Sequence, residues 1–174
     1  IGVYSFKEIS EKYPKNIENL GTIEQSMIGI AAGISIGGSI PIVHTIAPFL
    51  IERAFEQLKI DFGYQKLRGN FLSVGGAFDY TGLGASHHCP ADVNLIKSIP
   101  NFQCILPGNA NEFEKLFDST VLNDYPTYIR LSDSSNTHQV NVEFGKASMI
   151  KNDGDVVLVV VGDMLDITLE ATVN

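Results

Sequence analysis

Apolar residues recur along the 174-residue chain with two different periods, and stretches of the two kinds alternate. Apolar residues three or four positions apart predict helices, because such residues share one helical face. Short apolar or β-branched runs bounded by glycine, proline or polar residues predict strands. Helices are expected over 5–13, 22–36, 48–65, 92–100 and 110–122, and strands over 16–20, 40–45, 70–75, 104–107 and 127–131.

The alternation of strands with helices predicts an α/β fold. We expect a mostly parallel sheet covered by helices on both faces, which is a three-layer α/β/α arrangement. In such sheets the ligand binds beyond the carboxyl ends of the strands. This rule selects four segments as the candidate site, namely 21–25, 44–49, 75–88 and 131–133.

The last part of the chain predicts the beginning of a second unit. A polar stretch at 132–139 is expected to lead into an edge hairpin or a linker. The apolar run "DVVLVVVG" at 155–162 then predicts a strand that opens a second β-α unit. Because the sequence begins without Met and stops within a helical pattern, we expect a fragment or a partly ordered subunit.

Composition restricts the class of partner and the compartment. The apolar share of 44% and the charged share of 18% are typical of a soluble globular protein. A net charge of −8 argues against nucleic acid or an anionic membrane as partner, since both require a basic face. Cys89 and Cys104 could form one disulfide at most, so a reducing cytoplasm is expected. No apolar run reaches the roughly 18 residues of a membrane span.

The stretch "NLGTIEQSMIGIAAG" at 19–33 places one acid, Glu24, among apolar residues at the start of a helix. Thr22 and Gln25 fit a capping box, so the helix start does not require Glu24. An acid in the first turn contributes about 0.3–1 kcal/mol through the helix dipole. Burial, however, disfavours the charged form of a carboxylate. A helix-end role stays open, but the pattern favours a functional one.

The other polar candidates carry weaker signals. His87 and His88 follow the glycine-rich loop, and without an evident third ligand they favour substrate contact or proton transfer over zinc binding. His44 ends a strand and could be a satisfied polar group. Arg130 lies within an apolar strand, which favours a buried partner of an acid over a ligand clamp. Nothing marks Cys89 as a nucleophile.

Four stretches resemble, in order, the pyrimidine-binding domain of the transketolase family over roughly residues 5–131. They read "NLGTIEQSMIGIAAG", "IAPFLIERAFEQLKIDFGYQ", "GLGASHH" and "IPNFQCILPGNANEFEKLF". The resemblance implies that residues 1–140 are this domain, with its first strand and helix missing before position 1. Residues 141–174 would then be a linker and the first β-α unit of a truncated C-terminal domain.

The resemblance implies a thiamin diphosphate enzyme that transfers a two-carbon ketol unit between sugars or sugar phosphates. Glu24 matches the acid that hydrogen-bonds the cofactor's aminopyrimidine and so activates the cofactor. Phe49 matches the aromatic residue that stacks on this ring, although an aromatic residue after a strand is usually a core residue. Ile46 is expected to be a third cofactor-binding residue. His87 matches the substrate-facing histidine of the G-P-T-H-Q motif, here "GASHH". Three further substrate candidates are His88, His44 and Arg130.

The same resemblance implies partners. The chain lacks the G-D-G…N motif that binds Mg²⁺ or Ca²⁺ and the diphosphate, so no metal ligand is expected in this chain. A diphosphate-binding N-terminal transketolase domain or subunit would supply that site. A homodimer or a heterotetramer is implied, because sites in this family form between subunits. The small sugar substrate places the enzyme in cytoplasmic carbohydrate metabolism.

Three positions depart from the family pattern. The acid before the motif glycine is replaced by Leu83, a histidine of many transketolases falls near Gly75, and a phosphate-binding arginine falls at Asp133. We therefore expect a substrate different from the usual ketose phosphates. The alternatives are a deoxyxylulose-phosphate synthase, a 2-oxoacid dehydrogenase beta subunit and a non-catalytic assembly module. The presence of both Glu24 and Phe49 argues against the last of these.

Overall fold

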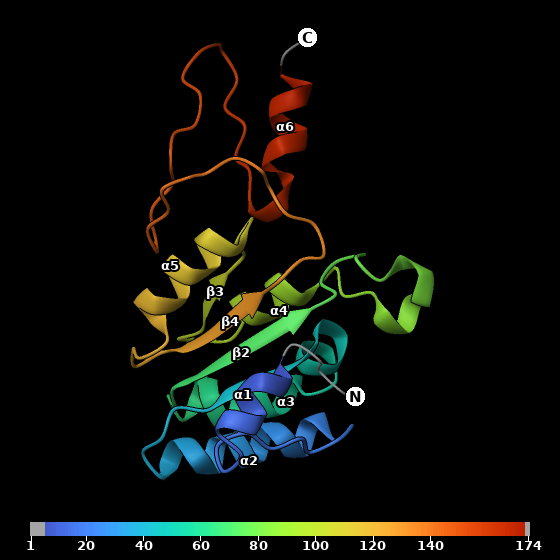
Figure 1. Ribbon diagram of the computed structural model, residues 1–174, viewed down its shortest axis with the longest axis vertical. Coiled ribbons are helices and arrows are strands. Elements are labelled where there is room, and N and C mark those ends of the chain that lie inside the picture. Colours follow the sequence, from blue (N-terminus) through green and yellow to red (C-terminus); the bar gives the residue numbers. More distant parts are fainter. Residues whose placement is uncertain (1–5, 173–174) are drawn as a thin grey trace.

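The computed structural model describes residues 6–172, and within them four strands form one sheet flanked by helices (Figure 1). The strands are β1 (Ile42–Ile46), β2 (Gly69–Val74), β3 (Gln103–Ile105) and β4 (Pro126–Arg130). Their order across the sheet is β1-β2-β4-β3, and all three neighbouring pairs are parallel. The expected α/β fold with a parallel sheet is thus confirmed. The outermost residues of the two expected domains, 1–5 and 173–174, lie outside the described part.

The helices occur where the apolar periodicity predicts them. They are α1 (Lys7–Lys12), α2 (Glu24–Ile36), η2 (Pro48–Glu52), α3 (Phe55–Gln57), η3 (Leu58–Tyr64), α4 (Asp92–Lys97), α5 (Ala110–Thr120) and α6 (Leu165–Ala171). Short 3₁₀ turns lie at η4 (Thr81–Leu83), η5 (Ala85–His87) and η6 (Gly162–Met164). Ser5, where the first helix was expected to begin, lies outside the described residues. No helix within 6–172 has the length and apolar character to cross a membrane.

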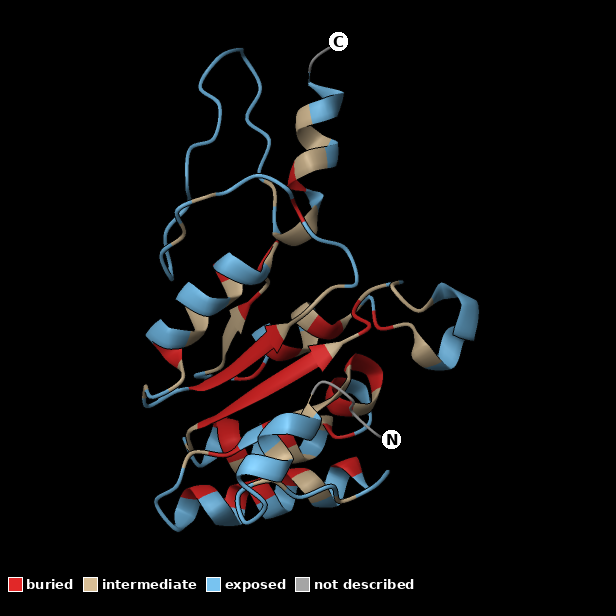
Figure 2. Ribbon diagram, in the orientation of Figure 1, coloured by how far each residue is buried: buried red, intermediate tan, exposed pale blue. Residues whose placement is uncertain are grey.

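The side chains of the strands alternate between two apolar layers, which confirms the three-layer arrangement. On one face Val43, Phe71 and Tyr128 pack against the helices from α2 to α4, and on the other Leu72 and Ile129 pack against α5. The cores of β2 and β4 are buried between these layers (Figure 2). Strands buried on both faces are mostly apolar, although the buried polar residues Asn70, Ser73 and Thr127 interrupt the runs of β2 and β4.

The helix expected over 48–65 is present, but its hydrogen bonding is mostly π-helical. Arg53 N–H donates to the carbonyl of Pro48, five residues earlier, at 3.0 Å. The apolar face of this helix is buried, since Leu50, Ile51 and Leu58 are fully buried. π-turns occur frequently at functional sites, so the residues on this helix are candidates for such a site.

Two expectations before and at α2 are wrong. Residues 16–20, where a strand was expected, form no strand. The capping box is also wrong, because α2 begins at Glu24 and its N-cap is Ile23, for which the described residues give no side-chain cap. Thr22 lies one position too early to cap the helix. The chain enters α2 through a turn at Gly21, whose N–H donates to Asn19 Oδ1 at 3.0 Å, and Gly21 has a φ of +78°.

The strand expected at 155–162 is wrong as well. Residues 156–161 form no ladder with any strand of the described sheet, and they run as an exposed segment towards α6 (Figure 2). Val157 and Val159 are each 87% exposed. An apolar β-branched run forms a strand only when a neighbouring strand pairs with it. The expected hairpin after residue 139 is likewise not seen within 6–172, and the linker stays a prediction.

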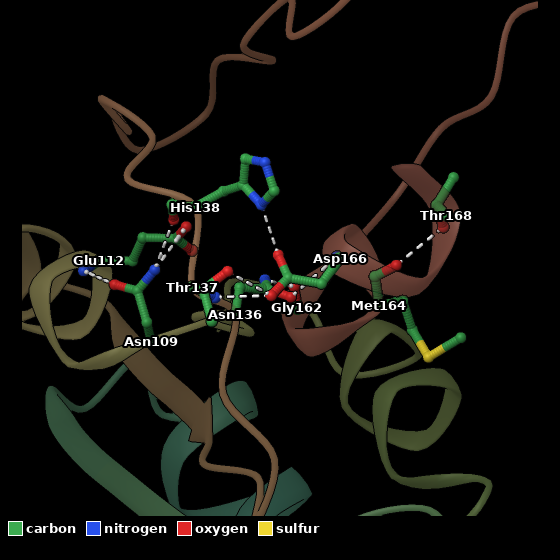
Figure 3. A network of polar contacts seen from close by, with 9 residues as sticks. All are labelled: Asn109, Glu112, Asn136, Thr137, His138, Gly162, Met164, Asp166 and Thr168. Carbon is green, nitrogen blue, oxygen red and sulfur yellow. Dashed lines mark hydrogen bonds and ion pairs between the residues drawn. The ribbon is translucent and has the colours of Figure 1, made fainter. Parts of the chain in front are cut away.

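A polar network attaches the beginning of α6 to residues 108 and 136–138 (Figure 3). Buried Asn136 donates its N–H to the Gly108 carbonyl at 2.7 Å and its side-chain amide to the Gly162 carbonyl at 2.6 Å. The Asp166 carboxylate accepts from the Thr137 N–H at 2.7 Å and lies 2.7 Å from His138 Nδ1. Because these groups belong to three separate segments, the network holds the start of α6 in place.

Acid is expected to weaken this attachment at Asp166. The Thr137 N–H, followed by His138 and the Thr137 hydroxyl, lowers the pKa of Asp166 to about 2. An unfolded aspartate titrates near 3.9, so the stabilisation is complete above about pH 4 and disappears as the pH falls towards 2. NMR titration of the Asp166 carboxyl should give a midpoint near 2, and Asp166→Asn should abolish this acid-sensitive step.

The matched control is Asp155→Asn, which removes an exposed acid from the same part of the chain. It should leave the acid-sensitive step of stability intact. A carboxyl of Asp166 that titrates at the value of an unfolded aspartate would contradict the network.

Candidate functional site

Three of the four expected site segments lie at one edge of the sheet. Because β1, β2 and β4 are parallel, their carboxyl ends meet at the same edge. Residues 47–49, 75–88 and 131–133 follow directly from these ends. The fourth segment, 21–25, joins them through a contact between Glu24 and the helix after β1.

Glu24 is the first residue of α2 and only 2% of it is exposed. Its Oε2 accepts a hydrogen bond from Arg53 Nη1 at 2.7 Å. A buried carboxylate requires a partner, because desolvation of an unpaired charge is costly. The Arg53 side chain supplies the positive charge and remains 43% exposed. Glu24 is therefore a buried acid whose ion pair opens towards solvent.

Phe49 connects this ion pair to the glycine-rich loop. The guanidinium carbon of Arg53 lies 4.1 Å from the centre of the Phe49 ring, which is a cation-π contact. The Phe49 ring also packs edge-on against the His87 imidazole, with ring centres 5.3 Å apart and ring planes at 66°. We call Glu24, Arg53, Phe49 and His87 the Glu24 cluster. Three of its four members were expected from the sequence.

His87 and Ile46 reach this region from the glycine-rich loop and from the end of β1. His87 ends the 3₁₀ turn η5 and its Nδ1 lies 3.0 Å from Ser86 Oγ, so a neighbouring hydroxyl orients the ring. Ile46 is the half-buried last residue of β1, three positions before Phe49.

Two glycines shape the loop that carries His87. Gly75 has a φ of +68°, and a Cβ at this position would lie 2.4 Å from the Tyr80 ring. A Cβ at Gly76 would lie 2.2 Å from Arg130 Cδ. The loop then closes on a bridge in which Cys89 N–H donates to the Ala77 carbonyl at 2.8 Å. The "GG" pair after β2 thus permits both a left-handed turn and the passage of an arginine.

Arg130 pairs with an acid, as the sequence predicts. Its Nη1 lies 3.2 Å from Oδ1 of Asp92, which is fully buried. The other Asp92 oxygen accepts from the Tyr128 hydroxyl at 2.7 Å, and Ser73 Oγ lies 2.8 Å from that hydroxyl. Burial, followed by the Asp92 carboxylate, raises the pKa of Tyr128 well above its usual value, so Tyr128 stays a donor.

Beyond this network lies a cavity of about 370 Å³. Its lining consists of Gly76, Ala77, Phe78, Asp79, Arg130, Ser132, Asp163 and Met164. Ser132 Oγ donates to Asp163 at 2.9 Å, and burial is the main cause that raises the pKa of Asp79. The fold therefore places Arg130 at this cavity and with Asp92, and not in the Glu24 cluster.

The remaining candidates lie apart from the Glu24 cluster. His44 lies on the α5 face of the sheet, where its Nδ1 is 3.2 Å from the Leu72 carbonyl and burial lowers its pKa. His88 packs edge-on against Phe78, with ring centres 5.2 Å apart. Cys89 is a fully buried free thiol, and burial with the nearby Glu52 raises its pKa to about 12. Such a thiol is not a nucleophile at neutral pH.

The sequence reasoning missed Arg53. Its position four residues after Phe49 could have indicated the contact, because a cation and an aromatic ring at this spacing share a helical face. An aromatic face linked to a buried carboxylate can hold a flat nitrogen-containing ring, with the carboxyl group hydrogen-bonding a ring nitrogen. Within residues 6–172 no group of three histidine, cysteine or acidic side chains could hold a metal.

Comparison with known proteins identifies the family. The model described as the transketolase pyrimidine-binding domain matches residues 4–138. An uncharacterized 33.6 kDa protein in the fasciation locus of Rhodococcoides fascians is 35% identical over 172 residues, covering 99% of this chain and 55% of that protein. An apulose-4-phosphate transketolase subunit of Actinobacillus succinogenes is 30% identical over 168 residues, covering 94% of this chain and 54% of the relative.

A solved structure agrees with this assignment. A split gene transketolase, described as an inactive beta4 tetramer, matches with a TM-score of 0.84 at 28% identity, covering 98% of this chain and 57% of that one. The chain spans about half the length of the curated relatives it matches. Because the family model covers most of the chain and the fold agrees over nearly its whole length, this chain belongs to the transketolase family, whose pyrimidine-binding domain it contains.

Proposed function

We propose that this chain forms the pyrimidine-binding part of a thiamin diphosphate-dependent, transketolase-like enzyme. The enzyme would transfer a two-carbon ketol unit between sugars or sugar phosphates. The observation that carries the proposal is the Glu24 cluster, in which a buried carboxylate and an aromatic face lie together in a transketolase-family domain. This donor set fits an aminopyrimidine ring. When bound, the cofactor supplies the carbanion chemistry, and the protein supplies orientation and electrostatics.

The site residues have distinct roles in this proposal. Glu24 holds the pyrimidine ring nitrogen through a hydrogen bond from a site shielded from water, where such a bond is strongest. Phe49 and Ile46 support the flat ring from its apolar side. His87 reaches the cluster from the glycine-rich loop and holds or moves a proton at a substrate oxygen. His88 and Arg130 support the loop that carries His87.

We propose that a second subunit or domain completes the site. It would bind the diphosphate and its Mg²⁺ or Ca²⁺, in line with the name of one relative, which describes it as a subunit of a transketolase. The solved split gene transketolase is described as an inactive tetramer of its beta chain. By analogy the present chain alone would be inactive, and its working form would be a homodimer or a heterotetramer with the partner. Two free cysteines suit a reducing cytoplasm.

The proposed substrate differs from the usual ketose phosphates. Leu83 is 60% exposed and Asp133 is exposed at positions where the family pattern would place an acid and a phosphate-binding arginine. Asp133 would repel a phosphate at that position. One relative is named an apulose-4-phosphate transketolase subunit, and this name supports a sugar other than xylulose 5-phosphate or ribose 5-phosphate.

The proposed function is tested by reconstitution. We expect the chain, mixed with a diphosphate-binding transketolase subunit, to bind thiamin diphosphate and to transfer a ketol unit to an aldose. Cofactor binding is followed by circular dichroism, and transfer by the appearance of the extended sugar. The chain without its partner should show no transfer. Failure of the mixture to bind the cofactor would overturn the function, whereas a normal rate with xylulose 5-phosphate and ribose 5-phosphate would overturn only the altered substrate.

A further inference from the structure

Arg53 lies where the proposed function requires a cofactor ring. Its guanidinium meets the Phe49 ring with the carbon atom 4.1 Å from the ring centre, and the same group donates to Glu24 Oε2 at 2.7 Å. These are the two contacts that a pyrimidine ring would make in this cluster. Among the four residues of the Glu24 cluster, Arg53 is the one that contacts both the Glu24 carboxylate and the Phe49 ring.

The guanidinium and an aminopyrimidine share the relevant chemistry. Both are flat and delocalised, both stack on an aromatic face, and both present an in-plane nitrogen to a carboxyl group. A guanidinium that stacks on Phe49 and bonds the Glu24 carboxyl oxygen therefore fills both positions of this pattern, although it donates where a pyrimidine ring nitrogen would accept. The two groups cannot occupy the face of Phe49 and the same carboxylate oxygen together.

The side chain that fills this position is able to leave it. The Arg53 side chain is 43% exposed, while that of Glu24 is 2% exposed. The backbone of Arg53 is held in the π-turn by its bond to Pro48, so only the side chain needs to move. Outside the cluster the charged group would return to water, where it is well solvated.

We propose that Arg53 is a placeholder that occupies the pyrimidine position in the empty subunit and must swing away when the cofactor binds. The inference rests on the proposed function of the Glu24 cluster. It assigns Arg53 two tasks in the empty state. The guanidinium neutralises the buried Glu24 carboxylate, and it keeps the Phe49 face covered. Arg53 is thus a gating residue for cofactor loading and not a catalytic residue.

A placeholder lowers the apparent affinity for the cofactor. When the competent state is only a fraction of the population, the dissociation constant rises by the inverse of that fraction. If the open state is about one part in ten, removing the placeholder tightens binding about tenfold. The opposite role, in which Arg53 stays on Glu24 and positions it in the loaded enzyme, predicts weaker binding after its removal. The sign of the change distinguishes the two roles.

The test uses Arg53→Met, which keeps a long side chain but can neither donate nor stack as a cation, in the enzyme reconstituted with its diphosphate-binding partner. We measure the dissociation constant of thiamin diphosphate in the presence of Mg²⁺ by circular dichroism. The placeholder predicts about tenfold tighter binding and faster loading for Arg53→Met. Arg68→Met removes an arginine outside the cluster and should bind as wild type does. Equal or weaker binding by Arg53→Met overturns the placeholder.

A second measurement keeps the inference testable if Arg53→Met does not fold. The chain has three arginines, Arg53, Arg68 and Arg130, so guanidinium signals of arginine-labelled wild-type chain can be assigned with Arg53→Lys and Arg68→Met. Saturation with thiamin diphosphate should shift the Arg53 signal to that of a solvated arginine. An unchanged Arg53 signal at saturation overturns the placeholder alone, whereas no cofactor binding by wild type overturns the proposed function with it.

Discussion

Replacing Glu24 by glutamine is expected to lower the turnover of the reconstituted enzyme by at least about 100-fold, the scale of losing one preorganised hydrogen-bonding group at a reacting centre. Glutamine has the size of glutamate, so it fills the same buried place. It cannot exchange a proton with a ring nitrogen, and its amide reverses the hydrogen-bond polarity at one of its two positions. The turnover number at saturating thiamin diphosphate is the quantity to measure.

The control for this substitution is Glu56→Gln. Glu56 is an exposed acid on α3, close in sequence to the cluster but with its side chain in water. Its replacement should leave turnover within about twofold, because surface substitutions away from such sites change little. Since Glu24→Gln also removes the anion that holds Arg53, cofactor affinity is measured alongside turnover. Unaltered turnover in Glu24→Gln at full cofactor occupancy would refute the role of Glu24.

The sheet and its core could be predicted from the sequence because each strand carries its own signal. The run at 70–75 carries Phe71 on one face and Leu72 and Val74 on the other, a pattern that favours a central strand of a parallel sheet. The buried face of the helix after β1 was also readable, because Leu50 and Leu58 lie on one face whether the turns are α or π. Local sequence therefore determined which residues are buried. It did not determine the hydrogen-bond register of that helix.

The failures arise where a tertiary contact decides the local structure. The run at 155–162 has the composition of a strand, but a strand exists only when another strand pairs with it. The capping pattern at Thr22 was shifted by the turn at Gly21 that brings Glu24 to the first helical position. Arg53 was missed for a similar reason, since its spacing from Phe49 is only a local signal and its partner Glu24 is 29 residues away in the chain.

The second large effect is expected at Asp92, which lies beneath the glycine-rich loop. Asp92→Asn should lower the free energy of unfolding by about 3–5 kcal/mol, the cost of breaking a buried ion pair by removing one partner. The asparagine leaves the Arg130 guanidinium without its carboxylate, and it provides one neutral acceptor in place of two charged ones. Urea denaturation of the chain measures this change, with Asp118→Asn on the exposed side of α5 as control.

The energy at Asp92 can be divided between its two partners. Tyr128→Phe removes the hydrogen bonds of one hydroxyl to Asp92 and to Ser73, and is expected to cost about 1–3 kcal/mol, the range for buried polar groups left without a partner. The double variant Asp92→Asn with Arg130→Met removes both charges, so it should be less destabilised than Asp92→Asn alone, since no uncompensated charge stays buried. Equal destabilisation of the single and double variants would mean that the shape of Asp92, and not its charge, supports the loop that carries His87.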